Sequence, residues 1–292
     1  MLNQIIINII IAGAIYILIA ISFALIYQTT RFFHFAHAVI FTSSAYFAFL
    51  FIQVLGWSYY TAIPTAIILA LFLGCIMELF IYRLLRGKKA SSIILLLASL
   101  GIYIVLQNFI SMVFGDDTKS IRTWEVKEGI NIMGAYITPV QIIIIITSIV
   151  LVILVVLYLS KAKTGKAMRA VANSQELSNF SGIKSDKIIL ISFAIGSALA
   201  GVAGILVSLD VDMTPTMGMN MLLMGVVAMI IGGVGSIRGL VLGSLLLATA
   251  QNLGVWYISS QWMDAIAFGI LLVFLLFRPQ GFYGKKLKKA EV

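Results

Sequence analysis

Long apolar runs dominate this chain, and short polar or charged connections separate each run from the next. Nine runs can be distinguished, over residues 5–27, 38–55, 61–82, 91–114, 137–159, 188–209, 221–236, 240–255 and 262–277. About 20 apolar residues in a helix cross the hydrocarbon core of a bilayer. Lipid offers the backbone no hydrogen-bond partner, so spanning segments are helices or closed barrels, and these unbroken runs lack a barrel's alternation. The sequence therefore predicts an all-α polytopic integral membrane protein with about eight to ten transmembrane helices, nine of them distinguished here.

The composition agrees with this fold class. Apolar residues make up 61% of the chain and charged residues 11%, which is too little polar surface to cover a soluble core. The connections leave no room for a soluble domain, so we expect one transmembrane domain over residues 1–292. The first run has no basic residue before it and no small-residue cleavage site, which predicts a retained span. Cys75 is the only cysteine, so neither a disulfide framework nor a thiolate metal site is expected.

The basic residues alternate along the chain in a way that predicts its orientation. Of the 20 Lys and Arg residues, 17 lie in alternate connections, beginning with the one after the first run. They are Arg31, Arg83, Arg86, Lys88, Lys89, Lys161, Lys163, Lys166, Arg169, Lys184, Lys187, Arg238, Arg278, Lys285, Lys286, Lys288 and Lys289. The other three, Lys119, Arg122 and Lys127, share the 115–136 loop with four acidic residues. The positive-inside rule places the N-terminus outside and the C-terminus in the cytoplasm. The net charge of +9 therefore reflects membrane orientation, and we expect no nucleic-acid partner.

Ionisable side chains inside the runs are few. Glu78 and Asp264 lie near the ends of their runs, where interfacial carboxylates are expected, and this counts against an ion-coupled transporter. His34 and His37 stand one helical turn apart, but no third ligand follows them, so we expect hydrogen-bonded interfacial histidines and no metal site. Neither a GxSxG sequence nor a Walker A sequence occurs. The chain is therefore predicted to be no enzyme and to hold no cofactor, and any ATP is bound by other subunits.

Small residues predict close helix contacts. Gly196, Ala200 and Gly204 follow at steps of four, a spacing that suits packing within one subunit or between subunits. Glycines interrupt the apolar stretch that runs from residue 221 to residue 255. They predict a re-entrant or hairpin turn at the inner face.

The 160–187 connection is the one long inward loop. Good helix formers with apolar residues near helical spacing predict a short amphipathic helix over residues 166–180, ended by Gly182 in the manner of a C-cap. Such a helix could lie on anionic lipid, or it could fit a groove on a soluble partner. The physical pattern alone does not rank these two uses.

Four sequence blocks carry a resemblance to a known family. The first contains Phe35 and His37, the second is RAVA at residues 169–172 followed by Gly182 and Ile183, the third is GGVGSIRGLVLGSLLL at 232–247, and the fourth is FRPQGFYG at 277–284. In this order they resemble the branched-chain amino acid permeases LivH and LivM of ABC importers, over essentially the whole chain. The matching motif residues of the last two blocks are Gly232, Gly233, Gly235, Gly239, Gly243, Arg278, Pro279 and Gly281. His34, Ala38 and Arg238 depart from the pattern, which leaves the substrate open, because urea permeases share much of it.

The resemblance implies a permease subunit of an ATP-driven importer in the inner membrane of a prokaryote. Its expected partners are a LivM-like second permease, two ABC ATPase subunits, an extracytoplasmic solute-binding protein and membrane lipid. The 160–187 segment would be the coupling loop, with Lys166, Arg169, Ala170, Val171, Ala172, Gly182 and Ile183 as ATPase-coupling residues.

Two further sites are expected from this assignment. The binding protein would dock on the 115–136 and 210–219 loops. The candidate path residues are the intramembrane amides Gln107, Asn108, Gln251 and Asn252. The alternatives are a urea or other small-solute ABC permease, a secondary transporter or channel working alone, and a structural scaffold.

Overall fold

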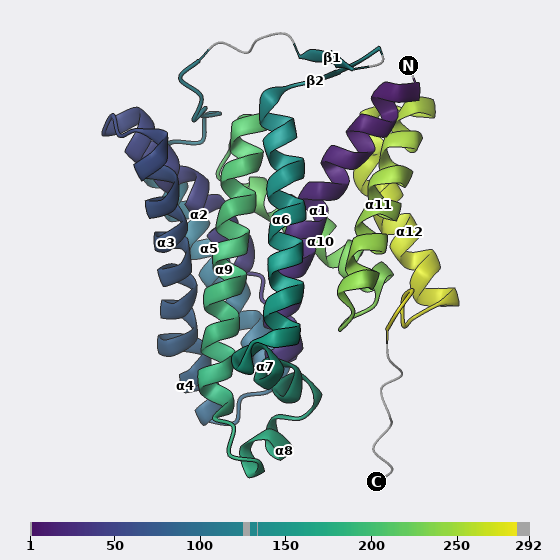
Figure 1. Cartoon of the computed structure of the whole chain (residues 1–292). Coiled ribbons are helices and arrows are strands. Elements are labelled where there is room, and N and C mark those ends of the chain that lie inside the picture. The colour runs from purple at the N-terminus through teal and green to yellow at the C-terminus, as the bar shows by residue number, and fades with distance from the viewer. Residues whose placement is uncertain (1, 125–128, 133, 285–292) are drawn as a thin grey trace.

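The computed structural model describes residues 2–124, 129–132 and 134–284, which form a bundle of long helices (Figure 1). The predicted charges at Lys127, Lys285, Lys286, Lys288 and Lys289 lie outside these described residues. The long helices are α1 (Leu2–Thr30), α2 (His37–Phe49), α3 (Tyr59–Met77), α5 (Ser92–Phe114), α6 (Pro139–Lys161), α9 (Ser185–Asp210), α10 (Met217–Gly232), α11 (Ile237–Tyr257) and α12 (Met263–Phe277). The shorter helices are α4 (Arg83–Gly87), α7 (Lys163–Asn173) and α8 (Gln175–Phe180). Two π-helical segments, Leu50–Val54 and Glu78–Tyr82, continue α2 and α3, and a 3-10 turn, Ser260–Trp262, precedes α12.

The predicted all-α polytopic membrane fold is confirmed. Within the described residues, eight helical stretches are long and apolar enough to cross a membrane. The run predicted at 221–236 corresponds to α10, a shorter apolar helix of 16 residues. It is short because Gly233 adopts a φ of +94°, which ends the helix at Gly232. The run predicted at 240–255 corresponds to α11, which is longer, with 21 residues. It begins earlier than predicted, at Ile237, because the Ser236 hydroxyl accepts a hydrogen bond from the Gly239 N–H and caps the helix.

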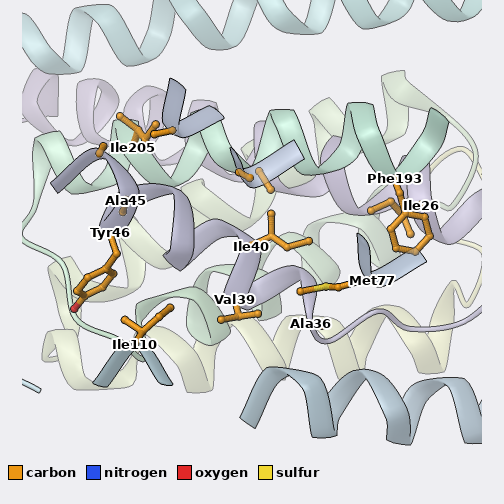
Figure 2. Packing of buried hydrophobic residues seen from close by; sticks show 14 of the residues in the cluster. Ile26, Ala36, Val39, Ile40, Ala45, Tyr46, Met77, Ile110, Phe193 and Ile205 are labelled. Carbon is orange, nitrogen blue, oxygen red and sulfur yellow. The ribbon is translucent and has the colours of Figure 1, made fainter. Parts of the chain in front are cut away.

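Helix α1 is the central element of the bundle. It packs against α6, α9, α10 and α11, and most of its inner two thirds is buried. Side chains from four helices meet beside it, namely Ile26 of α1, Ile40 of α2, Met77 of α3 and Phe193 of α9 (Figure 2). In contrast, α3, α5, α6 and α12 expose many large apolar side chains, as expected of helices that face lipid or another membrane subunit.

The small-residue stripe of α9 packs within this chain. A Cβ added to Gly196 would lie 2.8 Å from the Ser22 carbonyl oxygen of α1, and one added to Gly201 would lie 3.1 Å from the Ala70 Cβ of α3. Gly204 lies against the backbone of Phe41 in α2. The stripe therefore lets α9 approach three neighbouring helices closely.

The two ends of the bundle differ. One end carries a small antiparallel hairpin of β1 (Ile130–Ile132) and β2 (Ala135–Ile137), and the start of α1 is tied to it because the Gln4 amide donates a hydrogen bond of 3.1 Å to the Tyr136 carbonyl (Figure 1). Helices α4, α7 and α8 lie at the opposite end (Figure 1). The hairpin is a short strand element not predicted from the sequence.

Candidate coupling surface and transport path

The long connection between α6 and α9 contains two helices instead of the single one predicted over residues 166–180. Helix α7 ends at Asn173, Ser174 is extended with φ −157° and ψ 118°, and α8 begins at Gln175. The Ser174 hydroxyl accepts a hydrogen bond of 3.3 Å from the Leu177 N–H and so caps the second helix. Serine favours such caps over helix interiors, because its hydroxyl competes for backbone groups.

Helix α7 is amphipathic, as predicted. Met168 and Val171 are buried against the transmembrane body, whereas Lys166 and Arg169 are exposed. Gly165 faces the end of α6, where an added Cβ would lie 2.7 Å from the Leu159 Cα. Ala170 and Ala172 are partly buried at the border between these faces. The predicted coupling residues therefore divide between a face that packs inward and a face that is free to meet a partner.

Helix α8 presents apolar side chains to the outside. Leu177 is 68% exposed and Phe180 is 89% exposed, so two large apolar side chains of this six-residue helix are uncovered. Gly182 has a φ of +80°, and its left-handed backbone ends the segment as predicted. Ile183 turns back and packs against the main core cluster.

Hydrogen bonds join this connection to the inner end of α1. The Arg31 guanidinium donates to the Ala172 carbonyl, and the Gln175 amide donates to the Thr29 carbonyl at 2.6 Å. The Ser185 hydroxyl in turn donates to the Gln175 carbonyl at 3.2 Å. The sequence predicts Arg31 only as a marker of orientation and predicts neither of these contacts, because contacts across about 140 residues leave no local pattern.

The first motif block lies next to this junction, between α1 and α2. His37 is buried, and its Nε2 forms a hydrogen bond of 2.9 Å with the Ser22 hydroxyl, while the Phe35 N–H donates to the Ser99 hydroxyl at 3.1 Å. His34 is also buried, and its Nδ1 forms a hydrogen bond of 3.0 Å with the Tyr82 hydroxyl. The two histidines are thus hydrogen-bonded as expected, but they lie in the protein interior and not at an interface.

A buried ion pair stands close to these histidines. Glu78, predicted as an interfacial carboxylate, is instead completely buried in the π-helical segment. It still reaches the predicted basic cluster, because the Arg86 guanidinium donates to both carboxylate oxygens, one of them at 3.0 Å. Asp186 at the start of α9 lies 3.8 Å from Arg86 and 3.6 Å from Arg83. These charges link α3 and α4 to the helix that follows the coupling segment.

The third and fourth motif blocks pack on each other. The predicted hairpin turn is present between α10 and α11, and the chain after α12 lies against it. The Phe282 and Tyr283 N–H groups donate to the Ile231 and Gly232 carbonyls at 2.9 and 3.1 Å. Gly233 and Gly281 allow this contact, since a Cβ added to either would lie within 3 Å of backbone across it. Gly232, Gly239 and Gly243 instead let α10 and α11 approach each other, because a Cβ added to any of them would lie within 3 Å of the facing helix's backbone. Gly235, Arg278 and Pro279 are exposed.

The structure separates the four candidate path residues into two places. Gln251 is buried in α11, where it accepts a hydrogen bond of 2.7 Å from the Tyr16 hydroxyl and donates one of 3.1 Å to the Met263 carbonyl. Asn252 donates to the Ala248 carbonyl of its own helix. Gln107 and Asn108 lie on α5, on the other side of the bundle, and Asn108 is exposed (Figure 1).

The two connections expected to receive a binding protein are joined at the other end of the molecule. The Lys119 and Met213 backbones pair in an antiparallel bridge. The Arg122 guanidinium donates to Asp212 at 2.7 Å and to the Asp210 carbonyl at 3.1 Å. Residues 115–124 and 211–216 therefore form one rim, within the described part of the 115–136 loop.

Comparison with known proteins agrees with the motif blocks. Residues 5–276 match the family described as "Branched-chain amino acid transport system / permease component". The chain is 32% identical to the high-affinity branched-chain amino acid transport system permease protein BraD of Pseudomonas aeruginosa, over 94% of this chain and 92% of BraD. It is 30% identical to LivH of Escherichia coli over 94% and 92%, and 27% identical to the probable LivH of Methanocaldococcus jannaschii over 94% and 90%. The chain therefore belongs to this family and is a multi-pass inner-membrane permease subunit of the ABC transporter class.

Proposed function

We propose that this chain carries branched-chain or other hydrophobic amino acids into the cell, as one of two permease subunits of an ATP-driven importer. The observation that carries this proposal is the end-to-end similarity to BraD and LivH, whose names state a branched-chain amino acid substrate. The family assignment favours this function over a secondary transporter or a scaffold. The expected partners are a second permease, two ABC ATPase subunits and an extracytoplasmic solute-binding protein. On this proposal the chain itself is not an enzyme and holds no cofactor, since ATP is bound and hydrolysed by the partner ATPases.

The surface formed by α7 and α8 supports ATPase docking. Leu177 and Phe180 offer exposed apolar area, and Lys166 and Arg169 offer exposed charges that would orient the contact. Movement of this surface would reach the transmembrane core through two hydrogen bonds, from Arg31 to the Ala172 carbonyl and from Gln175 to the Thr29 carbonyl. Because α1 packs on four other helices, a shift at its inner end would bias the bundle between outward- and inward-open states.

The proposed orientation puts the N-terminus outside and the coupling helices in the cytoplasm. Basic side chains gather at the end that carries α4, α7 and α8, in keeping with the positive-inside rule. The rim formed by residues 115–124 and 211–216 then faces outward and is the proposed docking surface for the solute-binding protein.

The structure favours one pair of path candidates over the other. Gln251 already uses its amide within the chain, which suits a role in joining α1, α11 and the start of α12. Asn108 donates only within its own helix, to the Ile104 carbonyl at 2.7 Å and to the Gln107 side chain, and it is exposed on α5, where a polar side chain facing only lipid would be costly. We therefore propose that Gln107 and Asn108 face the second permease or the solute path between the two permeases.

Reconstitution tests this function. The chain and the transport subunits encoded beside it are placed in proteoliposomes, and uptake of labelled leucine, urea and a sugar is measured. We expect leucine uptake that needs ATP inside the vesicle and survives an uncoupler. Uptake of urea in place of leucine would overturn the substrate assignment, and uptake that collapses with the uncoupler would overturn ATP coupling.

Variants of the coupling surface add a structural control. Leu177→Ser with Phe180→Ser should abolish uptake and copurification of the ATPases. Val54→Ser changes an apolar residue that is 61% exposed at the opposite end of the bundle, and it should leave both intact. Equal effects of the two changes would contradict docking through α8.

A further inference from the structure

Two adjoining cavities lie between α4 and the α8–α9 junction, at the end of the bundle that carries the coupling helices. Their volumes are about 500 Å³ and about 600 Å³, and Arg83, Gln175 and Asp186 line both. Lys184, Lys187 and Leu190 also line the first cavity, whereas Leu79, Leu84 and Arg86 also line the second. Each cavity thus has a cationic side and an apolar side.

The cationic side has positive charge left over after its internal ion pairs. Arg86 is held by Glu78, and Asp186 lies 3.6 Å from the Nε of Arg83. Among the described residues, neither Lys184 nor Lys187 forms an ion pair, and Arg83 forms only the one with Asp186. Lysine and arginine side chains in this arrangement bind phosphate groups well.

The apolar side continues along the outer face of α3. Ile68, Phe72, Ile76, Phe80 and Leu84 follow at steps of four, and each is at least half exposed. This ridge leads from the middle of α3 to Leu84, which lines the second cavity, and α3 lies on the outside of the bundle (Figure 1). A free anion makes no use of such a ridge, but an acyl chain attached to the anion lies naturally along it.

From these features we propose that the cavities bind the headgroup of an anionic phospholipid, whose phosphate meets Arg83, Lys184 and Lys187 and whose acyl chains follow the α3 ridge. The lipid bridges α4 to the start of α9. Gln175 lines both cavities and also holds the inner end of α1, so the bound lipid stabilises the coupling segment against the transmembrane body. The proposal is independent of the transported solute, and only its assignment to the inner leaflet rests on the orientation given above.

Thermal unfolding of the purified full chain in detergent tests the site. Added phosphatidylglycerol should raise the unfolding midpoint, whereas phosphatidylcholine and inorganic phosphate should not. Lys184→Gln with Lys187→Gln should raise the phosphatidylglycerol concentration needed for half the effect by about tenfold or more. Lys161→Gln with Lys163→Gln removes the same charge from the same connection outside the cavities, and it should leave that concentration within about twofold.

Each other outcome overturns the proposal. Equal weakening in the two double variants would mean general attraction to a basic surface, and equal stabilisation by inorganic phosphate would mean a site for a free anion. Stabilisation by phosphatidylcholine would mean that the headgroup charge is not recognised. A second measurement covers a variant that fails to fold: phosphatidylglycerol with a photoactivatable group on its headgroup should crosslink the wild-type chain within residues 79–87 or 184–190, and crosslinks confined to other segments would reject the site.

Discussion

His34 and His37 are two imidazoles buried inside the protein. Their ring centroids are 5.8 Å apart, and each ring forms one hydrogen bond, to Tyr82 and to Ser22. His34 lies in the connection between α1 and α2, and burial, with a smaller effect from His37, lowers its pKa well below the usual value of 6.5. A protonated ring at this position would be a buried charge without a counter-ion.

This burial predicts how stability depends on pH. In the unfolded chain His34 binds a proton below about pH 6.5, but in the folded chain it does not, so the unfolded state binds more protons there. The contribution of His34 to stability is therefore complete above about pH 6.5 and is lost as the pH falls below that value. Unfolding midpoints measured from pH 5 to pH 8 should fall less steeply at acid pH for His34→Gln than for the wild type. Identical slopes would contradict a neutral buried His34.

Gly233 and Gly235 offer a matched pair of glycine substitutions. Both have positive φ, +94° and +98°, but a Cβ at Gly233 would meet the backbone of Gln280 and Gly284, whereas one at Gly235 would meet open space. Gly235→Ala should cost about 1 kcal/mol, from backbone strain alone. Gly233→Ala should cost about 3 kcal/mol or more, because the C-terminal segment must also move. Chemical unfolding in detergent measures both, and equal losses would argue against contact between the two motif blocks.

At the scale of elements, the π-helical turn at the end of α3 places a charged side chain, Glu78, in the protein interior. It places Glu78 inward, opposite Arg86, and Tyr82 against His34. The same turn is followed by α4, which faces Asp186 of α9. At the end of the bundle that carries α4, polar contacts therefore join α1, α2, α3 and α9, in addition to the apolar packing that these helices share.

Breaking this ion pair should be costly. Glu78→Leu leaves the Arg86 guanidinium, whose side chain is only 15% exposed, without its main partner, and a loss of about 3 kcal/mol is expected. Glu78→Leu with Arg86→Leu should recover much of that loss, since two apolar side chains replace the pair. Asp117→Ala removes the partner of an exposed ion pair with Lys119 and should cost under about 1 kcal/mol. A double variant less stable than the single one would contradict this account.

At the scale of the whole molecule, α1 joins the two ends of the bundle. Its first turn contacts the β1–β2 hairpin through Gln4, and its last turn contacts the start of α8 through Thr29. Helices α6, α9, α10 and α11 pack around it. On the function proposed above, this central helix of 29 residues would carry a displacement from one end of the bundle to the other.

The orientation of the whole molecule can be measured with single cysteines. In a Cys75→Ser background, Asp117→Cys and Lys166→Cys place one thiol at each end, and both positions are exposed. A membrane-impermeant maleimide added to intact spheroplasts should label position 117 and should label position 166 only after the membrane is opened. The reverse pattern would show that the N-terminus is inside.

The sequence by itself determined the membrane class, the spans, the glycine hairpin and the amphipathic character of the coupling segment. Each of these features depends on local composition or on helical spacing. A bilayer limits both strongly, because a spanning segment must be apolar and must satisfy its own backbone hydrogen bonds. Family membership also came from the chain alone, since its four motif blocks are contiguous stretches. Local signals failed at Ser174, where a cap divides one predicted helix in two.

Only the tertiary structure decided which polar residues are engaged and with which partners. From the sequence, Glu78 was expected at the membrane interface, but the structure buries it against Arg86. Gln251 and Asn108 were both candidate path residues, but Gln251 is buried in a hydrogen bond with Tyr16, whereas Asn108 is exposed. The contacts of Arg31 with Ala172 and of Gln175 with Thr29 each cross about 140 residues. Such pairs form only when separate helices are packed together, because the cost of burying a polar group depends on its neighbours in space and not on those along the chain.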